Sequence, residues 1–332
     1  MDNQNNQQRP GHMPRLSYGQ RFWRIWGPFI IEWGIQIAVS MAAAVVVMYQ
    51  YMNAHTKEVV AAYENQAAMM QFATKLMNMM QKYTTIISGA TALVVIPVML
   101  FLYHRDRNRE KYYGVATNKK APLWKYVLVV VFAGGASLAL NNLILIGNLS
   151  ALSATYETTA TSMYSAPFAA QIVCLAILSP IAEELVFRGL MFRRMREDTG
   201  AKLAIIYTSV VFGIFHGNFV QMLYGFLMGL MFAWLCEKYG SVLAPIVAHV
   251  TANLLALFAT KYQVFDRMIA DIRVIGMVTV GAATIAAIIY LQIKQIDEKP
   301  TGYFSMYKCS SLLKCYKSIT KHEIYIEMTC KM

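Results

Sequence analysis

Three charged side chains interrupt an apolar stretch of the sequence that begins near Phe168, within the segment SPIAEELVFRG. An ionisable residue at membrane depth costs at least about 2.5–3.5 kcal/mol on insertion scales, so Glu183, Glu184 and Arg188 need partners. Glu184 and Arg188 are four residues apart, and a helix therefore places them on one face as an ion pair with the acid first. Glu183 lies about 100° around the same helix. It must look to other helices or to water for its partner.

Two later apolar segments carry polar residues that suit hydrolysis. VVFGIFHGN places His216 four residues after Phe212, and APIVAHVTANLL places His249 and Asn253 on one helical face. The predicted depths agree to within about 10 Å, a mismatch that helix tilt or a water-filled cavity absorbs. We therefore expect Glu183, His216, His249 and Asn253 to converge.

General acid–base hydrolysis needs a group that takes a proton from water, a second that orients the water, and donors for the oxyanion. A carboxylate, two imidazoles and an amide supply these functions. The alternative is that the same side chains only hydrogen-bond helices together. Helix contacts alone do not require this combination of groups, so we favour hydrolysis.

Membrane-spanning helices must position these residues. The chain has 332 residues, of which 57% are hydrophobic and only 14% charged, too little polar surface for a soluble protein of this length. We predict an all-α fold, a polytopic membrane helix bundle of about eight spans, each long enough for a hydrocarbon layer of about 30 Å. The predicted spans are 28–50, 84–103, 124–147, 168–192, 202–217, 219–236, 241–260 and 272–293. The fifth and sixth, separated by HGN, should form a tight hairpin.

Basic residues set the predicted orientation. Residues 104–122 hold six Lys or Arg and residues 148–167 hold none, which predicts that both termini are cytoplasmic. The net charge of +12 falls mostly between spans, which favours anionic lipids over nucleic acid as partners. The 52–83 loop is then external, and its helical spacing of apolar residues predicts an amphipathic helix on the membrane. Glu32 in the first span is expected to reach the cytoplasmic interface.

Smaller signals concern packing and cofactors. Gly225 and Gly229 form a GxxxG motif that predicts close contact between helices of the same chain. Pro180 and Pro245 predict kinks beside the proposed site residues. The five cysteines have no CxxC spacing, which predicts neither a structural disulfide nor a cysteine metal site.

Three short motifs, in order and within apolar spans, resemble those of a known family. EELVFR, FGIFH and HVTAN are similar to the EExxxR, FxxxH and HxxxN motifs of the CAAX protease and bacteriocin-processing (CPBP, or Abi) intramembrane proteases, which include type II CAAX prenyl endopeptidases. The resemblance covers about residues 168–260. It implies that Glu183 with His216 activates water, that His249 and Asn253 stabilise the oxyanion, and that Glu184 and Arg188 support the site.

The residues leave two mechanisms open, and no cofactor is certain. Glu183, His216 and His249 offer Zn²⁺ one oxygen and two nitrogens, a ligand set known from soluble zinc proteases. The sequence has no HExxH motif, and Glu183 as a ligand could not freely serve as the base. A metal-free glutamate mechanism is at least as well supported.

The predicted function is an intramembrane endopeptidase that hydrolyses a membrane-anchored protein or peptide. The alternatives are a non-catalytic immunity or scaffold protein of the same fold and a proton-coupled transporter, although the chain has no paired broken spans in two related halves. The predicted organisation is a cytoplasmic segment (1–27), an N-terminal transmembrane region with the external loop (28–167), a protease core (168–260), a last span (261–299) and a cytoplasmic tail (300–332). Neither the substrate nor the oligomeric state follows from the sequence.

Overall fold

The computed structural model of the chain describes residues 16–113 and 120–296, and all regular structure in these ranges is helical. Most of the predicted segment 1–27 and the whole predicted tail 300–332 lie outside the described residues. The main helices are α1 (Tyr18–Ala54), α2 (Thr56–Glu64), α3 (Gln66–Tyr112), α4 (Tyr126–Ile146), α5 (Ala154–Tyr164), α9 (Ala201–Ile214), α10 (Phe219–Tyr239), α11 (Leu243–Lys261), α12 (Val264–Ile269) and α13 (Ile272–Lys294). Between α5 and α9 runs one interrupted helix, described below.

Seven of the described helical stretches are long and apolar enough to cross a membrane. They are α1, α3, Leu123–Ile146, Phe168–Thr199, α10, α11 and α13. Helix α9 is apolar but has only 14 residues, shorter than a full span. These helices confirm the predicted all-α, multi-pass membrane architecture, while the orientation of the termini stays a prediction.

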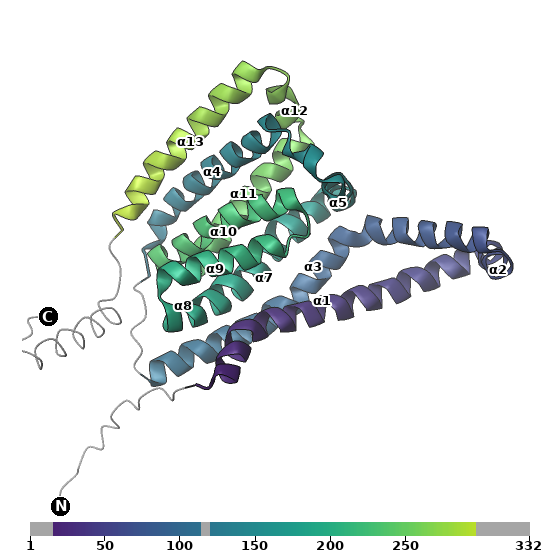
Figure 1. Cartoon of the computed structure of the whole chain (residues 1–332), viewed down its shortest axis with the longest axis horizontal. Helices are drawn as coiled ribbons and strands as arrows, with labels where there is room; N and C mark the ends of the chain where they lie inside the picture. The colour runs from purple at the N-terminus through teal and green to yellow at the C-terminus, as the bar shows by residue number, and fades with distance from the viewer. Residues whose placement is uncertain (1–15, 114–119, 297–332) are drawn as a thin grey trace, which may run out of the picture.

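Helices α1 and α3 form a long hairpin. They run together away from the rest of the bundle, with α2 at the far tip (Figure 1). At 1.5 Å per residue, the 37 residues of α1 and the 47 of α3 rise about 55 Å and 70 Å, well beyond a hydrocarbon layer of about 30 Å. The predicted amphipathic helix over 52–83 is therefore wrong as a separate element, because residues 66–83 are the first turns of continuous α3.

The tight hairpin predicted between the fifth and sixth spans is confirmed as α9 and α10. Gly217 supplies the positive φ of 82° that the turn needs, and the Asn218 side chain accepts from the Gln221 N–H to cap α10. A Cβ added at Gly213 of α9 would lie 2.6 Å from the Met222 carbonyl oxygen, and one at Gly229 would lie 3.1 Å from Ser209 Cβ. A Cβ at Gly225 would lie 3.2 Å from His216 Nδ1, so both glycines of the GxxxG motif pack within the chain, as predicted.

The helix that carries Glu183 and Glu184 changes hydrogen-bonding pattern along its length. It runs as α6 (Phe168–Gln171), a π-helical segment η3 (Ile172–Leu178), α7 (Ser179–Glu184), a second π-helical segment η4 (Leu185–Phe192) and α8 (Arg193–Thr199). In η3 the Ser179 N–H bonds to the Cys174 carbonyl five residues earlier. Such π turns are rare, and they are frequently found at functional sites. The two glutamates lie on the short α-helical turn between them.

Candidate active site

Glu184 is the centre of a buried charge network. Its Oε1 accepts a hydrogen bond from Arg188 Nη1 at 2.9 Å and lies 2.9 Å from His249 Nδ1. The side chains of Glu184 and Arg188 are 0% exposed. The ion pair predicted from the four-residue spacing is therefore present. The contact of Glu184 with His249 joins the interrupted helix to α11.

Aromatic rings enclose the Arg188 guanidinium. Its carbon lies 4.3 Å from the centroid of the Phe212 ring and 5.4 Å from that of Phe232, and Nη2 donates to the Gly229 carbonyl at 3.2 Å. A cation over a desolvated aromatic face is stabilised by up to about 2 kcal/mol. These contacts replace part of the water that the buried charge has lost.

The bond to Glu184 fixes the orientation of His249. A carboxylate only accepts hydrogen bonds, so His249 Nδ1 carries a proton and donates it to Glu184. The Phe232 ring stacks on the imidazole at 4.7 Å between centroids. Nε2 then faces the other way, 4.0 Å from Glu183 Oε2. His249 can donate through Nε2 only when both of its nitrogens are protonated.

Glu183 lines a cavity of about 620 Å³ between the interrupted helix, α1, α3 and α5. Its side chain is 29% exposed, while its Oε2 is buried without a hydrogen-bond partner in the protein. Hydrogen bonds from α3 hold the walls together: Thr85 Oγ1 donates to the Met163 carbonyl at 2.6 Å, and the Ser88 and Ser179 hydroxyls are 3.0 Å apart. A carboxylate on the wall of a polar cavity has room for a water molecule beside it.

Asn253 donates from Nδ2 to the Leu175 carbonyl oxygen at 3.0 Å. Pro180, five residues after Leu175, has no N–H, so the π-helical bond that Leu175 would accept cannot form. Pro180, where a kink was predicted, thus leaves a carbonyl free to accept a hydrogen bond from Asn253 of α11. Pro245 has no such effect, because it is the third residue of α11, where N–H groups lack helical acceptors anyway.

His216 lies in the turn after α9, where its Nδ1 donates to the Phe212 carbonyl at 2.7 Å. The Phe212 ring is 4.7 Å from the His216 ring and 5.9 Å from the His249 ring. Both histidine rings therefore lie near the same phenyl ring. His216 makes no hydrogen bond or ion pair with Glu183 among the described residues.

The side-chain positions do not provide the zinc ligand set considered above. Among the described residues, no three His, Cys, Asp or Glu side chains are grouped closely enough to hold a metal ion. Glu183 and His249 approach each other, but His216 does not complete the trio. We therefore derive no step through a metal.

The cavity also contains residues that the sequence reasoning missed. Glu32, which was expected at the cytoplasmic interface, lines the same cavity as Glu183. Gln36 and Ser40 follow it at intervals of four and line the cavity too, as does Thr91 of α3, which is 9% exposed with an unpartnered hydroxyl. Glu32, Gln36 and Ser40 are polar residues four apart in an otherwise apolar span, and this repeat could have predicted that α1 lines a polar cavity.

Comparison with known proteins finds a match in the region that carries these residues. Residues 165–255 match the family model described as "Type II CAAX prenyl endopeptidase Rce1-like". This region is therefore similar to the Rce1-like membrane proteases. The Rce1-like region contains the interrupted helix, α9, α10 and most of α11, and thus all six predicted site residues.

Two relatives match only part of the chain. It is 35% identical over 82 residues to "Putative membrane peptidase YdiL" of Bacillus subtilis (strain 168), which is 25% of this chain and 34% of that protein. It is 29% identical over 96 residues to "UPF0177 protein YxdF" of Lactococcus lactis subsp. lactis (strain IL1403), which is 29% of this chain and 52% of that protein. The chain thus spans about a third to a half of the length of these curated relatives. No solved structure matches it.

Proposed function

We propose that the chain is an intramembrane endopeptidase in which Glu183 activates a water molecule for attack on a peptide bond. The observation that supports this most directly is the position of the Glu183 carboxylate. It lines a cavity, its Oε2 lacks a protein partner, and it lies 4.0 Å from the nitrogen of a histidine whose ring is held by Glu184. The match of residues 165–255 to the Rce1-like family model supports the same activity.

In the proposed reaction Glu183 takes a proton from water as the oxygen attacks the carbonyl carbon of the peptide. The doubly protonated His249 donates from Nε2 to the oxyanion that forms, and its positive charge is balanced by Glu184. Asn253 Nδ2 has two hydrogens; one is bonded to the Leu175 carbonyl, and the other donates to the same oxyanion. Glu183 then passes its proton to the leaving amine as the C–N bond breaks.

We assign His216 the role of orienting the attacking water. Because Nδ1 donates to the Phe212 carbonyl, a neutral His216 has an accepting Nε2. The contact of Phe212 with both imidazoles supports a common site for the two histidines. The substrate is proposed to be a membrane-anchored protein or peptide.

Glu183→Gln tests the proposal. The amide keeps the side-chain volume but cannot accept the proton of water, so cleavage should fall to background while the variant stays folded. Cleavage of fluorogenic peptides, with and without a prenyl group, is measured in detergent and in liposomes. Glu64→Gln, which removes a carboxylate at the end of α2, is the matched control and should retain full activity.

Full activity of Glu183→Gln would remove Glu183 from the role of base. If neither the parent nor the variant cleaves any peptide, a non-catalytic scaffold or immunity function becomes the better explanation. A proton flux in liposomes that depends on Glu183 would instead support the transporter alternative.

A further inference from the structure

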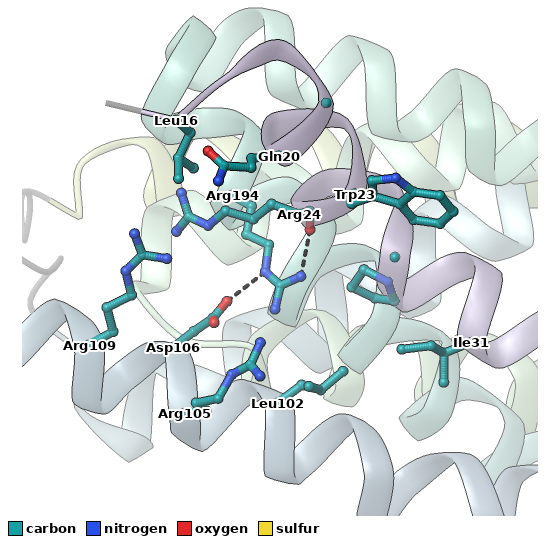
Figure 2. Close-up of a pocket in the computed structure, with 13 residues that line it drawn as sticks. Leu16, Gln20, Trp23, Arg24, Ile31, Leu102, Arg105, Asp106, Arg109 and Arg194 are labelled. Carbon is teal, nitrogen blue, oxygen red and sulfur yellow. Dashed lines mark hydrogen bonds and ion pairs between the residues drawn. The ribbon is translucent and has the colours of Figure 1, made fainter. Parts of the chain in front are cut away.

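A second pocket lies between the beginning of α1 and the end of α3, away from Glu183. It has a volume of about 580 Å³, and we call it the arginine pocket because Arg24, Arg105, Arg109 and Arg194 line it. Figure 2 shows arginine side chains gathered around the carboxylate of Asp106, the acid that lines this pocket. The pocket is thus a concentration of positive charge.

Only two of these four arginines form ion pairs with nearby carboxylates. Arg194 Nε donates to Asp106 at 2.6 Å, and Arg24 pairs with Glu197 at 2.7 Å. Among the described residues, no carboxylate pairs with Arg105 or Arg109. The position of Arg109 in the last turn of α3 favours one cation through the helix dipole, but it does not account for four guanidinium groups facing one space. Two positive charges therefore remain available to a ligand.

Apolar side chains continue from the arginines along the same two helices. Leu102 precedes Arg105 by one turn of α3, and Ile31 and Trp23 line the α1 side. The Trp23 side chain is 62% exposed and that of Ile31 40% exposed, as expected for residues that touch lipid at the membrane interface. A ligand that matches this pocket has an anionic group at one end and hydrocarbon at the other.

We propose that the arginine pocket binds the phosphate of an anionic phospholipid, with the acyl chains lying against Leu102 and Ile31. Guanidinium groups bind phosphate through paired, charge-assisted hydrogen bonds, which an isolated interfacial charge does not provide. Free inorganic phosphate shares the charge but would gain nothing from the apolar side of the pocket. This site is separate from the proposed active site and does not depend on its chemistry.

The test is lipid retention by the purified full chain in detergent, measured by native mass spectrometry. Phosphatidylglycerol and phosphatidylcholine with identical acyl chains are compared, and inorganic phosphate is added as a competitor. The pocket variant is Arg105→Gln with Arg109→Gln. Its matched control, Arg21→Gln with Lys111→Gln, removes the same charge from exposed residues at the same end of α1 and α3 that do not line the pocket.

The parent should retain phosphatidylglycerol in preference to phosphatidylcholine, and phosphate should not displace it. Each charge-assisted hydrogen bond lost weakens binding by a factor of about ten, so the pocket variant should bind at least about tenfold more weakly and the control within about twofold of the parent. Because Arg105 and Arg109 have no acidic partner among the described residues, their removal leaves no unpaired charge behind, and thermal unfolding should be unchanged. The two single variants, each about tenfold weaker, give the same test if the double variant does not purify.

Three results would overturn the proposal. One is equal retention of both lipids by the parent. Another is an equal loss of phosphatidylglycerol in the pocket variant and the control, which would indicate general surface charge. The third is displacement by inorganic phosphate alone, which would make the ligand a free anion.

Discussion

At the scale of single residues, one oxygen atom of Glu184 connects the two halves of the site. Oε1 serves both Arg188 and His249, while Oε2 of the same carboxylate is buried without a partner. The ion pair therefore holds the histidine in place as well as balancing charge. Neither side chain can be exchanged without affecting the other.

Arg188→Ala should destabilise the protein strongly. It leaves Glu184 buried and unpaired, and breaking a buried pair in this way costs about 3–5 kcal/mol. Thermal unfolding in detergent, followed by circular dichroism, measures the loss. Lys75→Ala is the control, because its pair with Glu58 is exposed and should contribute little. An unchanged unfolding temperature in Arg188→Ala would contradict the structural role of the pair.

Glu32→Gln should change substrate preference. Glu32 and Glu183 line one cavity, and none of the described residues lining it is Lys, Arg or His. A cationic group of the substrate should be attracted there, so the variant should raise KM about tenfold, or about 1.4 kcal/mol, for peptides with a basic residue near the cleaved bond. Uncharged peptides should be affected much less. An equal change for both peptide classes would show that Glu32 does not select charge.

The sequence predicted part of this site and missed part of it. The Glu184–Arg188 pair followed from helical spacing, because both residues lie on one helix. The location of Glu32 did not follow, because hydropathy indicates that a residue is in a span but not which helices pack against it. The bond from Asn253 to Leu175 was equally hidden, since it depends on where α11 crosses the interrupted helix.

At the scale of elements, the contact of α9 with α10 depends on glycines. A Cβ at Gly213 would lie 2.6 Å from a backbone oxygen that cannot move without shifting α10. Gly213→Ala should therefore destabilise the protein by about 1–3 kcal/mol, measured by thermal unfolding. Gly276→Ala on α13 is the control, because nothing lies within 4 Å of its added Cβ. Equal stability of the two variants would mean that the close contact of α9 with α10 at Gly213 does not contribute to the free energy of unfolding.

The helix type of the glutamate-bearing span was beyond sequence reasoning. A prediction of helix over 168–192 was correct, but the same apolar periodicity fits α and π turns over so short a stretch. Pro180 indicated a distortion and not its form. A π turn is defined by a hydrogen bond between residues five apart, such as that from Ser179 to Cys174, and only the structure gives these bonds.

At the scale of the whole molecule, two regions build the proposed active site. The Rce1-like region supplies Glu183, His249 and Asn253, while α1, α3 and α5 supply the opposite walls of the cavity. The N-terminal region, which carried none of the family motifs, therefore takes part in enclosing the site. Sequence reasoning identified the spans of this region but assigned it no role.

The length of the α1–α3 hairpin links the proposed enzyme to the thickness of its membrane. Helices α10 and α11, with 21 and 19 residues, rise about 32 and 29 Å and match a bilayer, whereas α1 and α3 are far longer. Long helices respond to hydrophobic mismatch by tilting, and here the tilt would move one wall of the Glu183 cavity against the other.

Cleavage in liposomes should therefore peak in bilayers whose hydrocarbon thickness is near about 30 Å and decline in thinner and thicker ones. A series of phosphatidylcholines with increasing acyl-chain length measures this, and mixed micelles of the same lipids, which impose no thickness, should abolish the trend. A rate independent of chain length would indicate that the hairpin and the bundle move as one body. If the peak is found, the membrane that surrounds this protein acts as a regulator of its rate.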